Sequence, residues 1–362
     1  MNRLQALYSE IGQSPWLDNL RRGWITSGEL RDWVNDGVRG ITSNPTIFQK
    51  AMTGTDVYDD QLAELSRHDS STLENYWTLA VSDIVDALDI LRPVYDTSNG
   101  EDGFVSVEVD PGLADDTEGT ITAARELHER INRPNLYVKI PATSAGMPAI
   151  KQMIAEGKSI NVTLIFSVNR YLEVIEAYLA GLEAHQGDLS HISSVASFFI
   201  SRTDTEVDRR LEALGTPQAL ELRGLAAIAQ ARVAYQHFCG RFSGPRWAAL
   251  ASRGARKQRP LWASTSTKNP NYPDTLYVDA LIGPNTVNTL PDATLAAFMD
   301  HGTVGRTVDS DISKAYEDLE RIMSVGVDLN DVARVLEEEG VAAFIKSFDG
   351  LLTSLDEKTH NL

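Results

Sequence analysis

Cysteine is almost absent from this sequence of 362 residues, and Cys239 is its single occurrence. One cysteine excludes both an internal disulfide and a thiolate cluster for a metal, and it favours a reduced, intracellular compartment. Long apolar runs are also lacking, so we expect no membrane-spanning segment. Residues 1–13 lack the basic start and apolar core of a signal peptide. These absences together predict a cytoplasmic protein.

Positive charge is scarce as well: the sequence has 33 lysine and arginine residues and 51 aspartate and glutamate residues, which gives a net charge of -18. Nucleic acids and anionic membranes bind broad basic patches, so we expect neither as a partner. A small phosphorylated substrate needs only a few cations in a pocket, which the overall charge permits. The seven histidines show no metal-ligand spacing, and we expect no metal site.

The sequence does contain a repeating unit of a short apolar strand, a polar turn and an amphipathic helix. Strands are predicted at residues 15–20, 38–42, 104–109, 136–140, 159–164, 192–200, 260–264 and 285–290. Such alternation implies a parallel sheet, and about eight units in roughly 300 residues fit an α/β fold of the (β/α)₈ TIM-barrel type better than a doubly wound sheet. No linker rich in proline and serine interrupts the pattern, so we expect residues 1–362 to form a single domain.

Helical patterns add to this barrel at several places. Residues 55–99 are predicted to form a helical insertion, and residues 291–362 to form C-terminal helices after the last strand. One helical stretch is expected over residues 217–240. Thr26 or Ser27 is predicted to cap the helix after the first strand, and Gly350 to end a helix.

Lys139 stands inside an apolar run that favours a buried strand, residues 136–140. Burial disfavours the ammonium form of a lysine, so such a side chain can become the free amine that attacks a ketone and forms a Schiff base. The alternative is an edge-strand lysine whose ammonium group reaches solvent.

Polar residues occur at or just beyond the carboxyl ends of most predicted strands. They are Asp18, Asn44, Glu108, Lys139, Asn161, Thr163, Ser197 and Lys268, with Arg202 shortly after the sixth strand. Each alone has a structural explanation as a helix cap or a charge at the rim. In a (β/α)₈ barrel, however, the active site lies at these strand ends, so the set around one lysine predicts a lined pocket.

Four of these segments carry a family resemblance. They are GITSNPTIF at 40–48, VEVDP at 107–111, VKIPAT at 138–143 and NVTLIFS at 161–167. In this order they resemble the strand-end motifs of the transaldolase family, over about Trp16 to Leu290. The length and the helical insertion resemble the longer bacterial branch. The resemblance implies a class I aldolase barrel that uses no cofactor.

The resemblance also implies roles for the site residues. Lys139 matches the Schiff-base lysine, Asp18 the general acid and base, and Glu108 with Thr163 the pair that positions a water. Residues matching those that bind the substrate are Asn44 and Asn161 for the dihydroxyacetone hydroxyls, and Ser197 and Arg202 for the phosphate. Lys268 stands where many relatives have a second phosphate-binding arginine.

The function implied is transfer of a dihydroxyacetone unit in the pentose phosphate pathway. The donor would be sedoheptulose 7-phosphate or fructose 6-phosphate, and the acceptor glyceraldehyde 3-phosphate or erythrose 4-phosphate. Two alternatives stay open: a lyase resembling fructose-6-phosphate aldolase, which releases free dihydroxyacetone, and a non-catalytic barrel that binds phosphosugars. The sequence leaves the oligomeric state open between a monomer and a homodimer.

Overall fold

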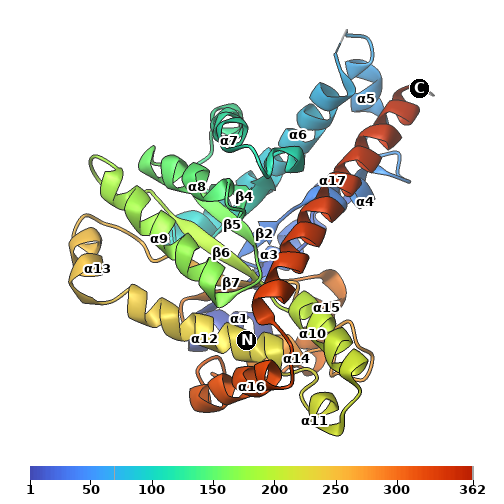
Figure 1. Cartoon of the computed structure of the whole chain (residues 1–362). Helices are drawn as coiled ribbons and strands as arrows, with labels where there is room; N and C mark the ends of the chain where they lie inside the picture. The colour runs from blue at the N-terminus through green and yellow to red at the C-terminus, as the bar shows by residue number, and fades with distance from the viewer. Residues whose placement is uncertain (69, 361–362) are drawn as a thin grey trace.

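Eight parallel strands close into a barrel in chain order, with β1 also paired to β8. In this computed structural model, which describes residues 1–68 and 70–360, the strands are β1 (Gln13–Leu17), β2 (Gly40–Thr42), β3 (Phe104–Glu108), β4 (Leu136–Pro141), β5 (Ile160–Ile165), β6 (Ser194–Phe199), β7 (Arg259–Ala263) and β8 (Thr286–Leu290) (Figure 1). Each overlaps one of the predicted strands. The predicted (β/α)₈ barrel is therefore confirmed.

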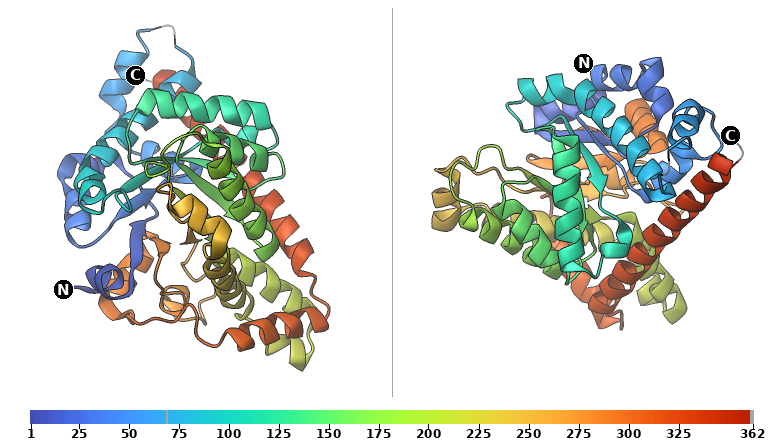
Figure 2. Two further views of the ribbon diagram at one scale, coloured as in Figure 1. Left: turned by 90° about the vertical axis from the view of Figure 1, so that its left-hand side faces the viewer. Right: turned by 90° about the horizontal axis from the view of Figure 1, so that it is seen from above.

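Helices surround this barrel and extend it at two places (Figures 1 and 2). The first half of the chain contains α1 (Arg3–Ala6), the π-helical turn η1 (Leu7–Ile11), α2 (Arg22–Ser27), α3 (Glu29–Asn35), α4 (Pro45–Met52), α5 (Asp59–Leu65), α6 (Thr72–Thr97), the 3₁₀ turn η2 (Pro111–Leu113), α7 (Thr117–Ile131), α8 (Gly146–Ala155) and α9 (Val168–Ala184). The second half contains α10 (Ser201–Leu214), α11 (Pro217–Leu220), α12 (Ala226–Arg241), α13 (Gly244–Ala251), α14 (Leu276–Ala280), α15 (Asp292–His301), α16 (Ile312–Ser324) and α17 (Leu329–His360). None of the described helices is long and apolar enough to cross a bilayer.

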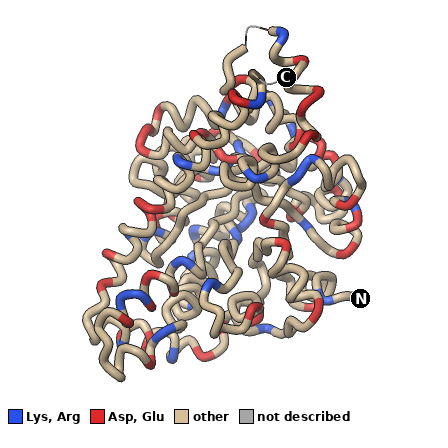
Figure 3. Tube along the Cα trace, turned by 90° about the vertical axis from the view of Figure 1, so that its right-hand side faces the viewer, with Lys and Arg blue, Asp and Glu red and all other residues tan. Residues whose placement is uncertain are grey.

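Acidic residues are spread along the outer helices, with basic residues between them (Figure 3).

The first strand lies two residues earlier than predicted, and it ends before Asp18. Gln13 and Ser14 are polar and give no strand signal, yet both pair in register with β8. Their side chains are bonded inside the protein: Gln13 Nε2 donates to the Leu281 carbonyl at 2.8 Å, and the Ser14 hydroxyl donates to Asp102. Asp18 consequently lies just beyond the carboxyl end of β1 and not within the strand.

Two predicted helix boundaries are wrong. Thr26 and Ser27 belong to α2 itself, and α3 starts after Gly28, whose φ of +89° breaks the helical path. The predicted helix over 217–240 is interrupted between α11 and α12, where Gly224 has a φ of +73° and donates its N–H to Asp208 Oδ1 at 2.8 Å. In both places a glycine in the left-handed region allows a turn that the apolar periodicity does not reveal.

Gly350 does not end a helix, since it lies in the middle of α17. A Cβ atom at this position would lie 2.7 Å from Gln49 Nε2 of α4. The glycine therefore allows α17 to approach α4 closely. Helix α17 crosses the carboxyl end of the barrel and reaches back to the inserted helices, where Lys358 pairs with Asp59 (Figure 2).

Aromatic rings fill the part of the barrel interior toward the amino ends of the strands, below the active site. Trp16, Phe104 and Tyr137 lie together, with ring centroids 6.4 Å apart for the first two and 4.1 Å apart for the last two. A Cβ atom on Gly40 would lie 2.4 Å from the Trp16 ring, so this strand position excludes any larger residue. Because side chains alternate along a strand, Asp18 and Lys139, two positions further on, also face the interior above these rings.

Below the rings, one buried carboxylate joins two arginines. Asp102 accepts hydrogen bonds from Arg39 Nε at 2.9 Å, from Arg259 Nη2 at 3.3 Å and from Trp16 Nε1 at 2.9 Å. The Asp102 side chain is fully buried. This cluster of Asp102, Arg39 and Arg259, the floor cluster, closes the end of the barrel opposite the site.

Asp102→Ala is therefore expected to lower the free energy of unfolding by about 3–5 kcal/mol, because it leaves two largely buried guanidinium groups unpaired. Denaturant titration measures the change. The matched control is Asp89→Ala, which removes a carboxylate 56% exposed in its pair with Arg133, and which should cost about 1 kcal/mol or less. Equal losses in the two variants would contradict a structural role for the floor cluster.

Candidate active site

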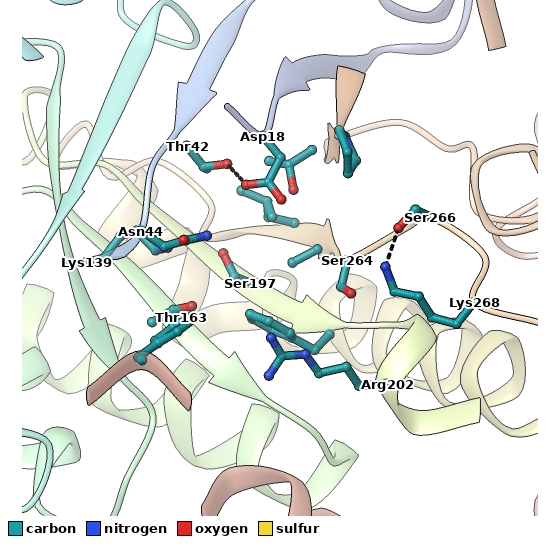
Figure 4. A pocket seen from close by; sticks show the side chains of 16 residues that line it. Asp18, Thr42, Asn44, Lys139, Thr163, Ser197, Arg202, Ser264, Ser266 and Lys268 are labelled. Carbon is teal, nitrogen blue, oxygen red and sulfur yellow. Dashed lines mark hydrogen bonds between the residues drawn. The ribbon is translucent and has the colours of Figure 1, made fainter. Parts of the chain in front are cut away.

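A cavity of about 130 Å³ lies at the carboxyl ends of the barrel strands (Figure 4). Seven of the predicted site residues line it, namely Asp18, Asn44, Lys139, Thr163, Ser197, Arg202 and Lys268. The remaining two lie directly behind this lining, Glu108 against Lys139 and Asn161 against Ser197. The fold thus brings all the predicted site residues together from separate strands and loops.

Lys139 is buried in the cavity wall, with 5% of its surface exposed. Its Nζ atom donates to the Ser43 carbonyl at 3.0 Å and lies 3.2 Å from Glu108 Oε2. Glu108 stands opposite Lys139 because the two residues are in register on β3 and β4. A solvent-reaching edge lysine is therefore excluded for this position, since the strand is flanked on both sides and the amine faces inward.

The Glu108 carboxyl group is buried as well, and burial raises its pKa, although the positive charge of Lys139 opposes the shift. Glu108 Oε2 and Thr163 Oγ1 are both buried; the first lies 3.2 Å from Lys139 Nζ, and the second has no hydrogen-bond partner among residues 1–68 and 70–360. Buried polar atoms without partners commonly hold an ordered water. The residue after Thr163 is Leu164, whose φ of +59° coincides with a register shift between β5 and β6, a strained backbone of the kind found at functional sites.

Asp18 supplies a second carboxyl group to the cavity. Its Oδ1 accepts a hydrogen bond from Thr42 Oγ1 at 2.7 Å. Burial raises the pKa of Asp18, while the Thr42 hydrogen bond and the charge of Lys139 act in the opposite direction. A carboxyl group with a raised pKa can both accept and return a proton near neutral pH.

Asn44 and Asn161 occupy different positions relative to the cavity. Asn44 lines it and also caps α4, because its Oδ1 accepts from the Ile47 N–H at 2.9 Å. Asn161 is fully buried, donates through Nδ2 to Ser106 Oγ at 3.0 Å and accepts from the Ser197 hydroxyl at 2.7 Å. These bonds fix the orientation of the Asn161 amide.

Two cations face the other side of the cavity (Figure 4). Arg202 lies in the first turn of α10, and burial lowers its pKa. Lys268 lies in the loop after β7 and donates to Ser266 Oγ at 2.8 Å; partial burial and then the charge of Arg202 lower its pKa. No described carboxylate forms an ion pair with either cation. Two adjacent unpaired cations are suited to bind a phosphate group.

The family comparison agrees with this geometry. The model of the transaldolase/fructose-6-phosphate aldolase family matches residues 15–355. The chain belongs to this family. The resemblance that the strand-end motifs indicate is thereby confirmed, and the match extends into α17, beyond the segment in which those motifs occur.

Proteins named transaldolase are similar to this chain over nearly its full length. The chain is 49% identical to transaldolase 2 of Streptomyces avermitilis over 359 residues, which are 98% of this chain and 96% of the relative. It is 52% identical to a transaldolase of Thermobifida fusca over 354 residues, 96% of each chain. A transaldolase of Mycobacterium leprae is 50% identical over 359 residues, covering 98% of this chain and 96% of the relative.

Some residues of this transaldolase-family site were not singled out from the sequence. Thr42 and Ser43 lie within the motif at 40–48. Their position at the end of the predicted strand 38–42 could have indicated that they belong to the site. Ser106 is a small polar residue inside a strand, and the same alternation that places Glu108 inward could have indicated it. Phe344 lines the cavity from α17, and no local signal links such a distant helix to the barrel mouth.

Proposed function

We propose that this protein is a transaldolase that holds a three-carbon unit as a Schiff base on Lys139. The observation that carries the proposal is a buried amine beside two carboxyl groups, in a cavity whose other side presents two unpaired cations. The names of relatives about half identical to the chain support the same activity. A sugar-phosphate binding protein would need the cations but no buried amine.

The substrate we propose is a ketose phosphate, either sedoheptulose 7-phosphate or fructose 6-phosphate. Its phosphate group would bind Arg202 and Lys268, with Ser197 nearby. Its hydroxyl groups at the three-carbon end would bind Asn44, and Asn161, buried behind the lining, would hold Ser197 in place. This orientation places the C2 ketone toward Lys139, because the amine and the cations line the same cavity from different sides.

The first step we propose is attack of the neutral Lys139 amine on C2. Glu108 has a raised pKa, so it can take a proton from the neighbouring ammonium group. A water held between Glu108 and Thr163 would give Thr163 Oγ1 a hydrogen-bond partner and carry protons to the C2 oxygen, which leaves as water. The resulting iminium ion withdraws electrons from the adjacent C3–C4 bond.

Asp18 then removes the proton of the C4 hydroxyl group. The C3–C4 bond breaks, its electron pair passes into the iminium group, and an aldose phosphate leaves. The three-carbon piece remains on Lys139 as an enamine. It adds to an acceptor, glyceraldehyde 3-phosphate or erythrose 4-phosphate, whose carbonyl oxygen takes the proton back from Asp18. Water addition at C2 finally releases the product ketose.

Arg202→Ala is expected to raise KM for fructose 6-phosphate by roughly 10- to 100-fold, since it removes a charge-assisted contact to phosphate. The effect on free dihydroxyacetone as donor should be small, because this donor carries no phosphate. Steady-state kinetics with both donors measure the difference. Arg209→Ala is the matched control, as Arg209 lies on the same helix, is 67% exposed and pairs with Glu206. Equal effects of Arg202→Ala on both donors would exclude phosphate binding by this residue.

A direct assay separates transaldolase from the two alternatives. The protein is incubated with fructose 6-phosphate, with and without erythrose 4-phosphate, and the products are quantified. We expect sedoheptulose 7-phosphate with the acceptor and little free dihydroxyacetone without it. Free dihydroxyacetone formed at a similar rate without acceptor would favour the lyase. No product in either mixture would favour the binding-only barrel.

We also propose that the reaction serves the pentose phosphate pathway in the cytoplasm, which the substrate class and the single cysteine support. The same mechanism requires no cofactor. The proposed partners are sugar phosphates alone, and the protein would act as one domain, as a monomer or a homodimer.

A further inference from the structure

Helix α17 contributes one residue, Phe344, to the lining of the cavity. Its buried residues make a single stripe, namely Val332, Leu336, Gly340, Phe344, Phe348, Leu351 and Leu355. Phe344 is 4% exposed and lines the same cavity as Lys139 and Thr163. A residue from the last helix of the chain thus contributes an apolar surface to a site that is otherwise built from the barrel.

Gly340, one helical turn before Phe344, explains how the helix comes so close. A Cβ atom at Gly340 would lie 3.1 Å from Leu164 Cδ2 and 3.6 Å from Arg202 Nη1. Glycine in the middle of a helix destabilises that helix relative to alanine. Its presence at this contact allows α17 to pack directly over the end of β5 and the start of α10.

Contacts on both sides of Phe344 hold the helix in place. Toward the C-terminus, the ring of Phe348 packs edge-on against Tyr76 of α6 with centroids 5.2 Å apart, and the hydroxyl groups of Thr46 and Ser347 lie 2.8 Å apart. Toward the N-terminus, Asp331 pairs with Arg210 of α10 at 2.8 Å. The Phe344 ring is therefore part of a fixed wall.

We propose that Phe344 is a specificity-determining residue that keeps proton-donating water away from C3 of the three-carbon unit on Lys139. This inference rests on the proposed function. In the enamine state the unit has two fates. It can add to the acceptor aldehyde, or its C3 can take a proton and water can add at C2, which releases dihydroxyacetone and the free amine. An apolar wall excludes additional water that could protonate C3 and so disfavours the second fate, whereas the water that adds at C2 in either fate is the one proposed between Glu108 and Thr163.

The test measures the ratio of free dihydroxyacetone to transferred product, with fructose 6-phosphate and erythrose 4-phosphate as substrates. Phe344→Ala is expected to raise this ratio roughly tenfold, because the truncated side chain admits water. Phe344→Leu retains much of the volume and should stay close to the wild-type ratio. Lys346→Ala is the control, since Lys346 is exposed on the same helix.

An unchanged ratio in Phe344→Ala, with both rates reduced together, would overturn the inference and leave Phe344 a packing residue. Should Phe344→Ala fail to fold, the series Phe344→Leu and Phe344→Val decides, since the ratio must rise as the side chain becomes smaller. If the wild-type protein transfers normally and the variants show the same ratio of free dihydroxyacetone to transferred product, only this inference is contradicted. A wild-type protein that forms no transfer product contradicts the proposed function itself.

Discussion

Lys139→Met should lower kcat for transfer by roughly 10⁴-fold or more, with the barrel still folded. Without the amine, no covalent route from ketose to enamine remains, and loss of an enzyme nucleophile typically has an effect of this size. Methionine fills a similar volume in the buried wall. The neighbouring Glu108 would lose its cation, but burial raises its pKa, so it can become neutral in place. Steady-state transfer assays and thermal unfolding measure the two parts of this expectation.

The matched control for this variant is Lys151→Met. Lys151 lies on α8, directly after β4, and is exposed. It carries the same charge and should lose neither activity nor stability. Transfer by Lys139→Met within a few-fold of the wild-type rate would remove the covalent role from Lys139.

Asp18→Asn should lower the transfer rate by roughly 10²- to 10⁴-fold, the range expected for a positioned acid and base. The asparagine oxygen can still accept the hydrogen bond from Thr42, which preserves the geometry at 2.7 Å. Addition of substrate to Lys139 should continue, because it depends on Glu108 and Thr163. Cleavage of the C3–C4 bond should stall, so rapid quenching would find the intact substrate bound to the protein.

The pH dependence provides a second measurement of the same residue. Asp18 accepts the C4 proton only when ionised, and burial raises its pKa. The rate of C3–C4 cleavage, measured by rapid quenching, should therefore fall with decreasing pH above the ordinary titration range of an aspartate. Asp18→Asn should lack this fall, while substrate addition, which depends on Glu108, should keep its own pH dependence. Asp96→Asn is the control, because Asp96 is an exposed carboxylate on α6 that pairs with Arg92 and has no part in the Asp18 pKa shift. A wild-type rate in Asp18→Asn would exclude Asp18 as the base.

The barrel could be predicted from the sequence because its strands are short, buried and regularly separated by helices. The caps of α7 and α9 have a local cause, since Asp116 and Ser167 accept hydrogen bonds from N–H groups three residues later, and both residue types favour that position. The composition of the site could be predicted because strand ends converge in this fold. Register then decides details such as the pairing of Glu108 with Lys139.

Features that depend on distant contacts could not be predicted in this way. Gly350 has the local signature of a helix end, and only the proximity of Gln49 explains its place inside α17. Phe344 belongs to an ordinary apolar stripe, and its position in the cavity depends on how α17 crosses the barrel. Ser14 has no strand propensity, yet it lies in β1 because Asp102 and Arg259 bind its hydroxyl group. In each case a tertiary partner outweighs the local pattern.

Covalent trapping tests the role of Lys139 most directly. The protein is incubated with fructose 6-phosphate and reduced with borohydride, and its intact mass and peptide map are measured. We expect a stable dihydroxyacetone fragment on the peptide that contains Lys139, and none in Lys139→Met. A folded wild-type protein without an adduct, or with the adduct on another lysine, would contradict Schiff-base catalysis at this site.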